Sequence, residues 1–281
     1  MTDGQSAPTE PMVPMTIVPA GALEMITRAE IETQVGTARK FRRSLAGFRS
    51  AALTMATLDQ ETAAACTYML PRDKKTIEGP SIRLAEIVLA TWGNLRAGSR
   101  LIAEDDKTVT AQGFCHDLEN NVAVTVEQRR KITNRFGTRY SDDMVNVTAQ
   151  AACAIALRNA IFKVIPLALV EQIRTQAMRT AAGDETTLAE RRTKALAHFG
   201  TLGVSTERVL ARLAEFTEQP KTGVEDVTLK DMAILHGFAT SLRDGVATVE
   251  ELFPVAKEEP PASKAGALAE ELKGKKKEPP K

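Results

Sequence analysis

The 281-residue sequence has few of the residues that mark secreted, metal-binding or membrane proteins. Its three cysteines, Cys66, Cys115 and Cys153, form no CxxC pair, so neither a disulfide framework nor a zinc site is supported. No apolar run approaches the roughly 20 residues of a membrane span, and the acidic, proline-spaced N-terminus is unlike a signal peptide. These absences predict a cytoplasmic protein without membrane association.

Motifs of common enzymes are also missing. The three histidines do not stand at metal-ligand spacing, and no Walker-type, Rossmann-type, zincin or nucleophile-elbow motif occurs. Carboxylates that could bind Mg²⁺ occur in two short acidic stretches, as Asp105, Asp106, Asp142 and Asp143. These residue types are typical of a hairpin turn and a helix start, which is how we interpret them. We expect no enzyme activity and no cofactor.

Aromatic residues make up only 4% of the chain, against 43% hydrophobic residues, so the expected core is aliphatic and alanine-rich. The net charge of +1 conceals an uneven distribution. Residues 30–180 carry a net charge of +5, whereas the segments before and after them each carry −2. The basic surface, and with it a polyanionic partner, is therefore expected in the middle segment.

Hydrophobic patterning predicts the order of elements. Helical spacing extends from about 23 to 48 and again over 50–70, where Pro71 ends it, and a third helix begins at Pro80 and is closed by Gly93. Three runs typical of strands follow at 95–103, 108–116 and 122–133, joined by short polar turns as in an antiparallel meander.

An alanine-rich helix then runs from about 142 to Pro166, with an extension towards Arg179 left open. Its small side chains allow close approach to the sheet. The sequence thus predicts an α+β fold, in which a three- to four-stranded antiparallel meander packs on helices and a small all-α module follows. The predicted segments are a flexible arm at 1–22, a core domain at 23–180, a linker at 181–185, a helical module at 186–253 and a disordered charged tail at 254–281.

Two basic clusters stand out. In "RKFRRSLAGFR", Arg39, Arg42 and Arg43 share a helix face at spacing i, i+3, i+4, which suits a solvated face as well as a binding surface. The second cluster is the hairpin "TVEQRRKITNRFGTRY", residues 125–140. Charge that protects a sheet edge explains two or three of its five cations, whereas a nucleic-acid backbone explains all of them.

Arg158 interrupts an otherwise apolar helix. A buried arginine is rare unless it is paired. It therefore either pairs with a carboxylate inside the fold or lines a groove, and the sequence does not decide between these two interpretations.

The order helix, three strands, basic hairpin and arginine-bearing helix resembles the core of the single-strand annealing proteins, namely the Rad-fifty-two family and its phage relatives of the Erf, RecT and Red-beta groups. The resemblance covers about residues 65–170. Its first motif comprises Ile77, Glu78, Gly79, Leu84, Ala85 and Gly93. Its second motif comprises Ala154, Ala156, Leu157, Arg158, Asn159 and Ala160. The helical module at 186–253 is similar to the C-terminal portion of phage annealing proteins.

The resemblance implies an ATP-independent protein of a bacterial host cytoplasm that forms rings or helical filaments, binds single-stranded DNA and anneals complementary strands during recombination and repair. It further implies that a host single-strand-binding protein or a phage exonuclease docks on 186–253. The residues expected to line the DNA groove are Arg129, Arg130, Lys131, Arg135, Arg139, Arg158, Lys163, Lys74, Lys75 and Arg83.

The sequence departs from the family pattern in offering few aromatic residues for base stacking, the candidates being Trp92, Phe114, Phe136 and Tyr140. Electrostatic contacts to the DNA backbone would then dominate, with a steep salt dependence. Two alternatives remain: a self-assembling phage structural or adaptor protein without nucleic-acid activity, and, less favoured, a metal-dependent nuclease built on the four aspartates named above.

Overall fold

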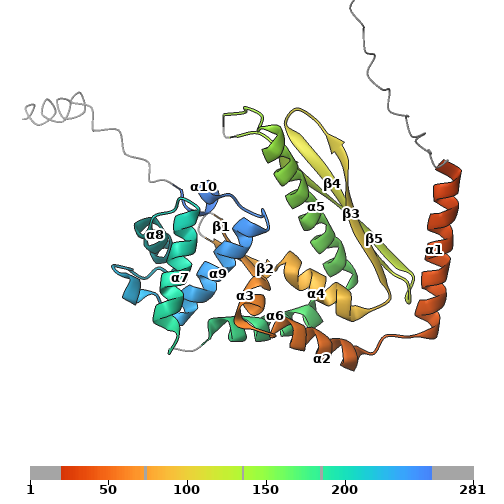
Figure 1. The fold of residues 1–281 in the computed structure, drawn as a ribbon, viewed down its shortest axis with the longest axis horizontal. Coiled ribbons are helices and arrows are strands. Elements are labelled where there is room, and N and C mark those ends of the chain that lie inside the picture. The colour runs from red at the N-terminus through yellow and green to blue at the C-terminus, as the bar shows by residue number, and fades with distance from the viewer. Residues whose placement is uncertain (1–19, 73–74, 135, 184–185, 255–281) are drawn as a thin grey trace, which may run out of the picture.

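The computed structural model describes residues 20–72, 75–134, 136–183 and 186–254 (Figure 1). The first half contains α1 (Ala20–Lys40), α2 (Leu45–Ala56), α3 (Gln60–Ala65), β1 (Thr67–Arg72), β2 (Lys75–Pro80), α4 (Ile82–Trp92), β3 (Leu95–Glu104), β4 (Thr108–Asp117) and β5 (Val122–Lys131). The second half contains α5 (Asp142–Val164), α6 (Leu167–Ala182), α7 (Leu188–Thr201), α8 (Thr206–Thr217), the 3₁₀ turn η1 (Val224–Asp226), α9 (Leu229–Arg243) and α10 (Val249–Leu252).

The predicted α+β fold is confirmed. Strands β3, β4 and β5 form an antiparallel sheet in that order, and α5 packs across one of its faces. Helix α5 separates this sheet from the C-terminal helices α7–α10, while α1 stands apart on the other side of the sheet (Figure 1). The molecule therefore contains a two-layer unit, the α5–sheet unit. Its sheet side is the sheet face away from α5, and its helix side is the side of α5 away from the sheet.

The sheet and α5 approach each other very closely because small residues line the contact. In β4, Val109, Ala111, Gly113 and Cys115 are buried on the side of α5, whereas the alternate residues Thr110, Gln112 and Phe114 are only partly buried. At Gly113 an added Cβ would lie 2.2 Å from the backbone oxygen of Ala156, so only glycine fits there. This period-two alternation was readable in the sequence and is confirmed.

Larger side chains fill the other two cores. The main core lies between α2, α3, α4, α6 and the end of α5, where Trp92 meets Phe48 edge-to-face at 4.8 Å. The C-terminal helices have their own core, in which Phe199 and Phe238 both pack edge-to-face on Phe253. Most of the few aromatic residues thus serve packing.

Three predictions about elements were wrong. The helix predicted over 50–70 ends at Ala56, and after the short α3 the chain forms strand β1, which pairs with β2 as a second, two-stranded sheet. Pro80 is the last residue of β2, and α4 begins after the N-cap Ser81, whose hydroxyl accepts a hydrogen bond from the backbone N–H of Leu84. The physical reason is tertiary: β1 packs along α9.

The third error is the continuous helix over 23–48. The chain leaves the helix after Lys40 and begins again after the N-cap Ser44. Arg43 lies in this connection and not on a helix face. Gly93 ends α4 with φ +74, as expected of a C-terminal glycine, and α5 stops before Pro166 without extending into α6.

The C-terminal helices are anchored to β1. The Ser241 hydroxyl of α9 accepts a hydrogen bond from the Met69 backbone N–H (3.2 Å) and donates one to the Met69 carbonyl (2.6 Å).

By length and composition α5 also passes as a membrane span, the one such helix among the described residues, a test that the core helix of a soluble protein passes too. Here α5 packs on the sheet.

Candidate nucleic-acid interface

The sheet has one face that no helix packs against along its length. We call it the helix-free face. The strand register places on it Arg96, Gly98, Arg100, Thr108, Thr110, Gln112, Phe114, His116, Ala123, Thr125, Glu127, Arg129 and Lys131. Directly opposed residues of antiparallel strands point to the same side, which makes this assignment a consequence of the pairing alone.

Four cations cross the helix-free face. Arg96 and Arg100 come from β3, and Arg129 and Lys131 from the far end of β5. The β4 partners of Arg96 and Lys131 are eight residues apart, so the row crosses the sheet diagonally and extends about 26 Å along the strand direction, at about 3.3 Å per residue. Glu127 is the one carboxylate on these three strand faces, and two carboxylates from outside them approach the ends of the row: Glu30 of α1 lies 3.9 Å from Arg96, and Asp105 lies 3.0 Å from Arg129.

An aromatic side chain lies within this row. The ring of Phe114 on β4 occupies the space above Gly98 of β3, where an added Cβ would meet it at 2.8 Å. Phe114 is only partly buried, so part of its ring stays accessible. Beside it, the guanidinium of Arg100 donates to the Gln112 side-chain oxygen at 2.9 and 3.2 Å.

The turn between β3 and β4 holds the basic hairpin in place. Arg129, whose side chain is 67% exposed, donates to Asp105 (3.0 Å) and to the Thr108 hydroxyl (2.9 Å). Arg139 donates to Glu104 at 2.6 Å. Two backbone N–H groups of the turn also bond Asp105, and these bonds hold the pKa of its carboxyl well below the usual range. Exposed pairs of this kind are weak, so a phosphate can replace the carboxylate.

Arg158 lies on the opposite side of the α5–sheet unit. It stands two residues after Ala156, which faces the sheet, and it shares the other side of α5 with Ala151 seven residues earlier. Its guanidinium is buried, bonds the side-chain oxygen of Asn159 and stacks over the Tyr68 ring at 4.7 Å. Burial lowers its pKa, against the opposing charges of Tyr68 and Asp244.

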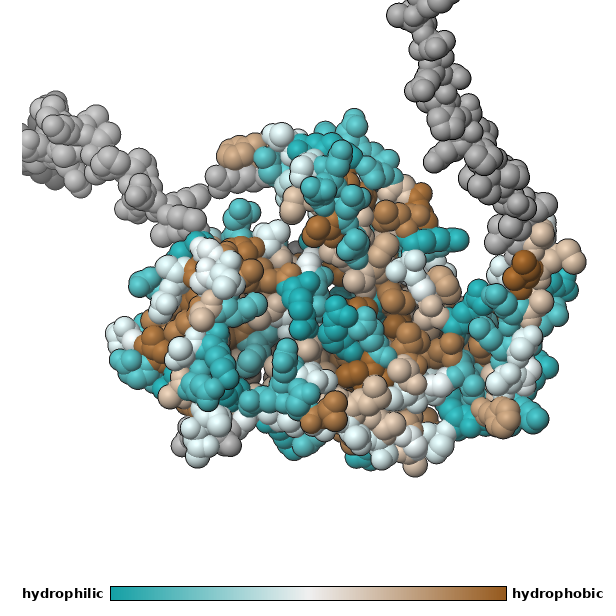
Figure 2. Space-filling view, in the orientation of Figure 1, coloured by the Kyte–Doolittle hydropathy of each residue, from teal (hydrophilic) through white to brown (hydrophobic). Residues whose placement is uncertain are grey.

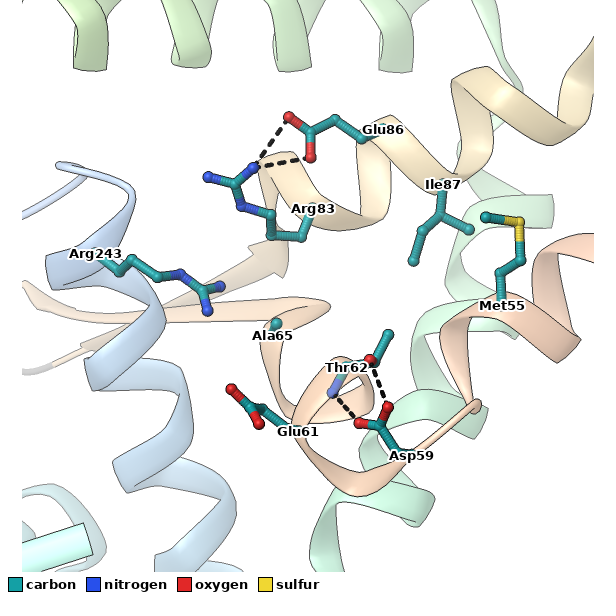
Figure 3. Close-up of a pocket in the computed structure, with 9 residues that line it drawn as sticks. All are labelled: Met55, Asp59, Glu61, Thr62, Ala65, Arg83, Glu86, Ile87 and Arg243. Carbon is teal, nitrogen blue, oxygen red and sulfur yellow. Dashed lines mark hydrogen bonds and ion pairs between the residues drawn. The ribbon is translucent and has the colours of Figure 1, made fainter. Parts of the chain in front are cut away.

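Arg83 shares Asp244 with this group, but its side chain stays 47% exposed. It bonds Glu86 within α4 and lies 3.8 Å from the buried carboxylate of Asp244 at the end of α9. Arg243 also pairs with Asp244, at 3.4 Å. The two arginines approach the same pocket, of about 440 Å³, from α4 and α9 (Figure 3), and hydrophilic residues gather over this region between α9 and α5 (Figure 2).

The remaining predicted residues are scattered. Arg130 points to the α5 side of β5, where burial lowers its pKa while the charges of Glu251 and Tyr140 oppose the shift. Lys163 is exposed at the last turn of α5. Lys74 and Arg135 lie outside the described residues, as does the side chain of Lys75. The described cations therefore do not line one groove: Arg129 and Lys131 lie on the helix-free face, and Arg83 and Arg158 on the helix side.

Sequence reasoning missed Arg96 and Arg100. The sequence could have indicated them, because pairing β3, β4 and β5 as a meander places both arginines on the same sheet face as Phe114 and Arg129. The arginines of the other basic cluster, "RKFRRSLAGFR", differ in exposure. Arg39 and Arg42 are exposed, whereas Arg43 is buried, bonded to Asp117 and Glu119, and stacked over the Trp92 ring at 4.8 Å.

Hydrogen bonds to Glu119 from the Arg43 backbone and from Asn94, with the Arg43 guanidinium adding to them, lower its pKa to about 2. Arg43 therefore serves the fold. Among the described residues, no group of three or more histidine, cysteine and carboxylate side chains is placed so that it could hold a metal ion. Comparisons with known protein families, with curated proteins and with solved structures found no match to this chain.

Proposed function

We propose that this protein binds single-stranded DNA and anneals complementary strands without ATP, as an oligomer in the cytoplasm of a bacterial host. The observation that carries the proposal is the row of four cations on the helix-free face. All three strands contribute side chains to this face, no helix packs along it, and an aromatic ring lies within the row. Such a surface suits a flexible polyanion with bases to stack.

The chemistry of the row favours strand binding over base reading. Arginine and lysine contact phosphates whatever the sequence, and Phe114 stacks on any base. A strand held mainly by its phosphates keeps base edges available for a complementary strand. We therefore expect weak sequence preference and steep salt dependence, with an apparent slope of about −0.7 per phosphate contact for single strands.

Assembly is supported by the sheet edges. Strands β3 and β5 both lie at the edge of the three-stranded sheet, so each presents unpaired backbone groups. Exposed apolar side chains accompany these edges: Leu101 and Ile102 on β3 and Val122 on β5. A head-to-tail contact between the two edges would repeat into a ring or filament and would join the cation rows of neighbouring copies.

The test is annealing of two complementary fluorescent oligonucleotides by the full-length protein, without ATP, over a salt series. The variant Arg129→Gln with Lys131→Gln removes two cations from the helix-free face. We expect slower annealing and a log–log salt slope for single-strand binding that is shallower by about 1.4, because two phosphate contacts are lost.

The matched control removes the same charge elsewhere, through Lys194→Gln on α7 with Lys230→Gln on α9, both exposed. It should anneal like the unmodified protein. Equal losses in the two double variants would show that net charge alone matters and would contradict this site. A wild-type protein that forms rings or filaments yet ignores oligonucleotides would instead support the structural-protein alternative.

A further inference from the structure

The segment joining α9 to α10 lies against the helix side of the α5–sheet unit. We call residues 243–251 the α9–α10 corner. Three of its side chains are carboxylates, Asp244, Glu250 and Glu251, against one cation, Arg243. The corner thus brings negative charge to the side of α5 on which Arg158 is buried and Arg83 is half-exposed.

The contact between the corner and α5 depends on a glycine. Gly245 has φ +63, and an added Cβ would lie 2.5 Å from the Cβ of Ala151 on α5. Ala151 and Arg158 are seven residues apart and so share one face of this helix. The close approach at Gly245 therefore holds the neighbouring Asp244 near the Arg158 side of α5.

The carboxylates of the corner stand where phosphates would be attracted. Asp244 pairs with Arg83 and Arg243 through one oxygen, while its other oxygen is buried without a hydrogen-bond partner. Its charge also acts on Arg158, and that of Glu251 acts on Arg130. Arg83 thus lies beside a carboxylate of the corner, and the charges of the corner also reach Arg158 and Arg130.

Burying the Asp244 carboxylate at this position costs free energy. Burial raises the pKa of Asp244, against the charges of Arg243 and Arg83, which shows that desolvation outweighs the attraction. A buried carboxylate with one unsatisfied oxygen costs free energy unless something compensates it. The Asp244 carboxylate lies beside arginines but lacks a hydrogen bond to one oxygen. A phosphate group that satisfies these arginines more fully could therefore replace it.

We propose that the α9–α10 corner is an internal competitor for single-stranded DNA: its carboxylates occupy a second phosphate-binding site formed by Arg83 and Arg158 until the corner moves off α5. This inference rests on the proposed function. Strand binding begins on the open, helix-free face, and displacement of the corner adds a second contact region on the other side of α5.

Two independent variants test the competitor. Asp244→Asn with Glu251→Gln removes the competing charges with little change of shape, and Gly245→Val forces the corner away from Ala151. Both should bind a fluorescent oligonucleotide about tenfold more tightly than wild type, the gain expected if the open state rises from about 10% to nearly full occupancy. Phenylglyoxal labelling of Arg158, read by peptide mass, should increase in both.

Matched controls separate competition from general effects. Glu190→Gln with Glu215→Gln removes two exposed carboxylates from α7 and α8. Gly203→Val introduces a side chain at φ +76 with nothing within 4 Å of the new Cβ, and so strains a turn without touching α5. Both controls should keep wild-type affinity and a protected Arg158.

The outcomes are distinguishable. A reactive Arg158 with unchanged oligonucleotide affinity would overturn competition while leaving the helix-free face intact as a binding site. Corner variants that bind more weakly than wild type, with Arg158 still protected, would show that the corner only supports the fold. Failure of wild type and every variant to bind oligonucleotides would overturn the proposed function itself.

Discussion

The two sides of the α5–sheet unit carry similar cations in different surroundings. On the sheet side, the cations lie on a face that no helix covers along its length, and their partners are exposed or polar neighbours such as Asp105, Gln112 and, from α1, Glu30. On the helix side, Arg158 is buried under Tyr68 and Arg83 faces the buried Asp244. Charge alone therefore does not make a binding surface; the cover over that charge decides which cations a phosphate can reach.

The basic hairpin shows this within three consecutive residues. Arg129 and Lys131 point to the helix-free face, and Arg130 between them points towards α5 and Glu251. One strand therefore supplies cations to both sides. Substitutions in this molecule can separate what each side contributes to binding and to stability.

The largest expected effect concerns Arg43, a cation that is covered completely. Arg43→Ala leaves the buried Asp117 and the half-buried Glu119 without their main partner, and should lower the free energy of unfolding by about 3–5 kcal/mol. Urea unfolding measures this. The adjacent Arg42→Ala, at an exposed position, should change it by less than about 0.5 kcal/mol. Equal effects would show that the buried ion pairs do not anchor this connection.

The next effect distinguishes the two faces of the sheet. Gly113→Ala on the α5 face puts a Cβ 2.2 Å from a backbone oxygen that cannot rotate away, and should cost about 3 kcal/mol. Gly98→Ala on the helix-free face meets only the end of the Phe114 ring, which can turn, and should cost about 1 kcal/mol or less. Thermal or urea unfolding of both variants gives the comparison; similar losses would mean that the helix-free face is also packed.

Acidification should weaken the helix side first. Burial lowers the pKa of His236 on α9 to about 4, with the charges of Arg191 and His198 adding to the shift. The unfolded chain binds the proton near pH 6.5 and the folded chain only near pH 4, so stability falls as the pH decreases through this window, by up to about 3 kcal/mol. Urea unfolding between pH 7 and 4 should show this decrease.

His236→Gln removes the titrating group and should flatten the pH dependence in that window. His116→Gln on the helix-free face serves as the control and should keep the wild-type profile. A profile unchanged by His236→Gln would assign the acid sensitivity to other groups. The pKa of Glu119 is lowered to about 2, so its own contribution to stability is lost mainly below pH 4.5, at the acidic end of this window and beyond it.

The smallest expected effect concerns stacking on the sheet side. Phe114→Leu keeps an apolar side chain over Gly98 but removes the aromatic ring, and should weaken oligonucleotide binding by about 1 kcal/mol, or roughly fivefold. Fluorescence anisotropy at fixed salt measures the change. Phe136→Leu, in the exposed turn before Arg139, is the matched control and should have no effect on affinity if the strand follows the diagonal row.

Local patterns in the sequence predicted the meander well. Uninterrupted alternation over 108–116, with polar turns on both sides, is enough to predict β4 and to assign Val109, Ala111 and Cys115 to its buried face. The stretch over 67–72 was misread because an alanine-rich helix precedes it. Its strand state depends on pairing with β2 and on the contact between Met69 and Ser241, 172 residues apart.

The candidate site, too, was predictable from the sequence in part. From its sequence alone, this chain is an α+β protein with a basic middle segment, three strands with defined faces and an alanine-lined helix. Which cations are exposed and which are buried depends on tertiary contacts, such as Tyr68 over Arg158 and Asp117 beside Arg43. Contacts between residues so distant in sequence leave no local periodicity, so only the tertiary structure could separate the two sides.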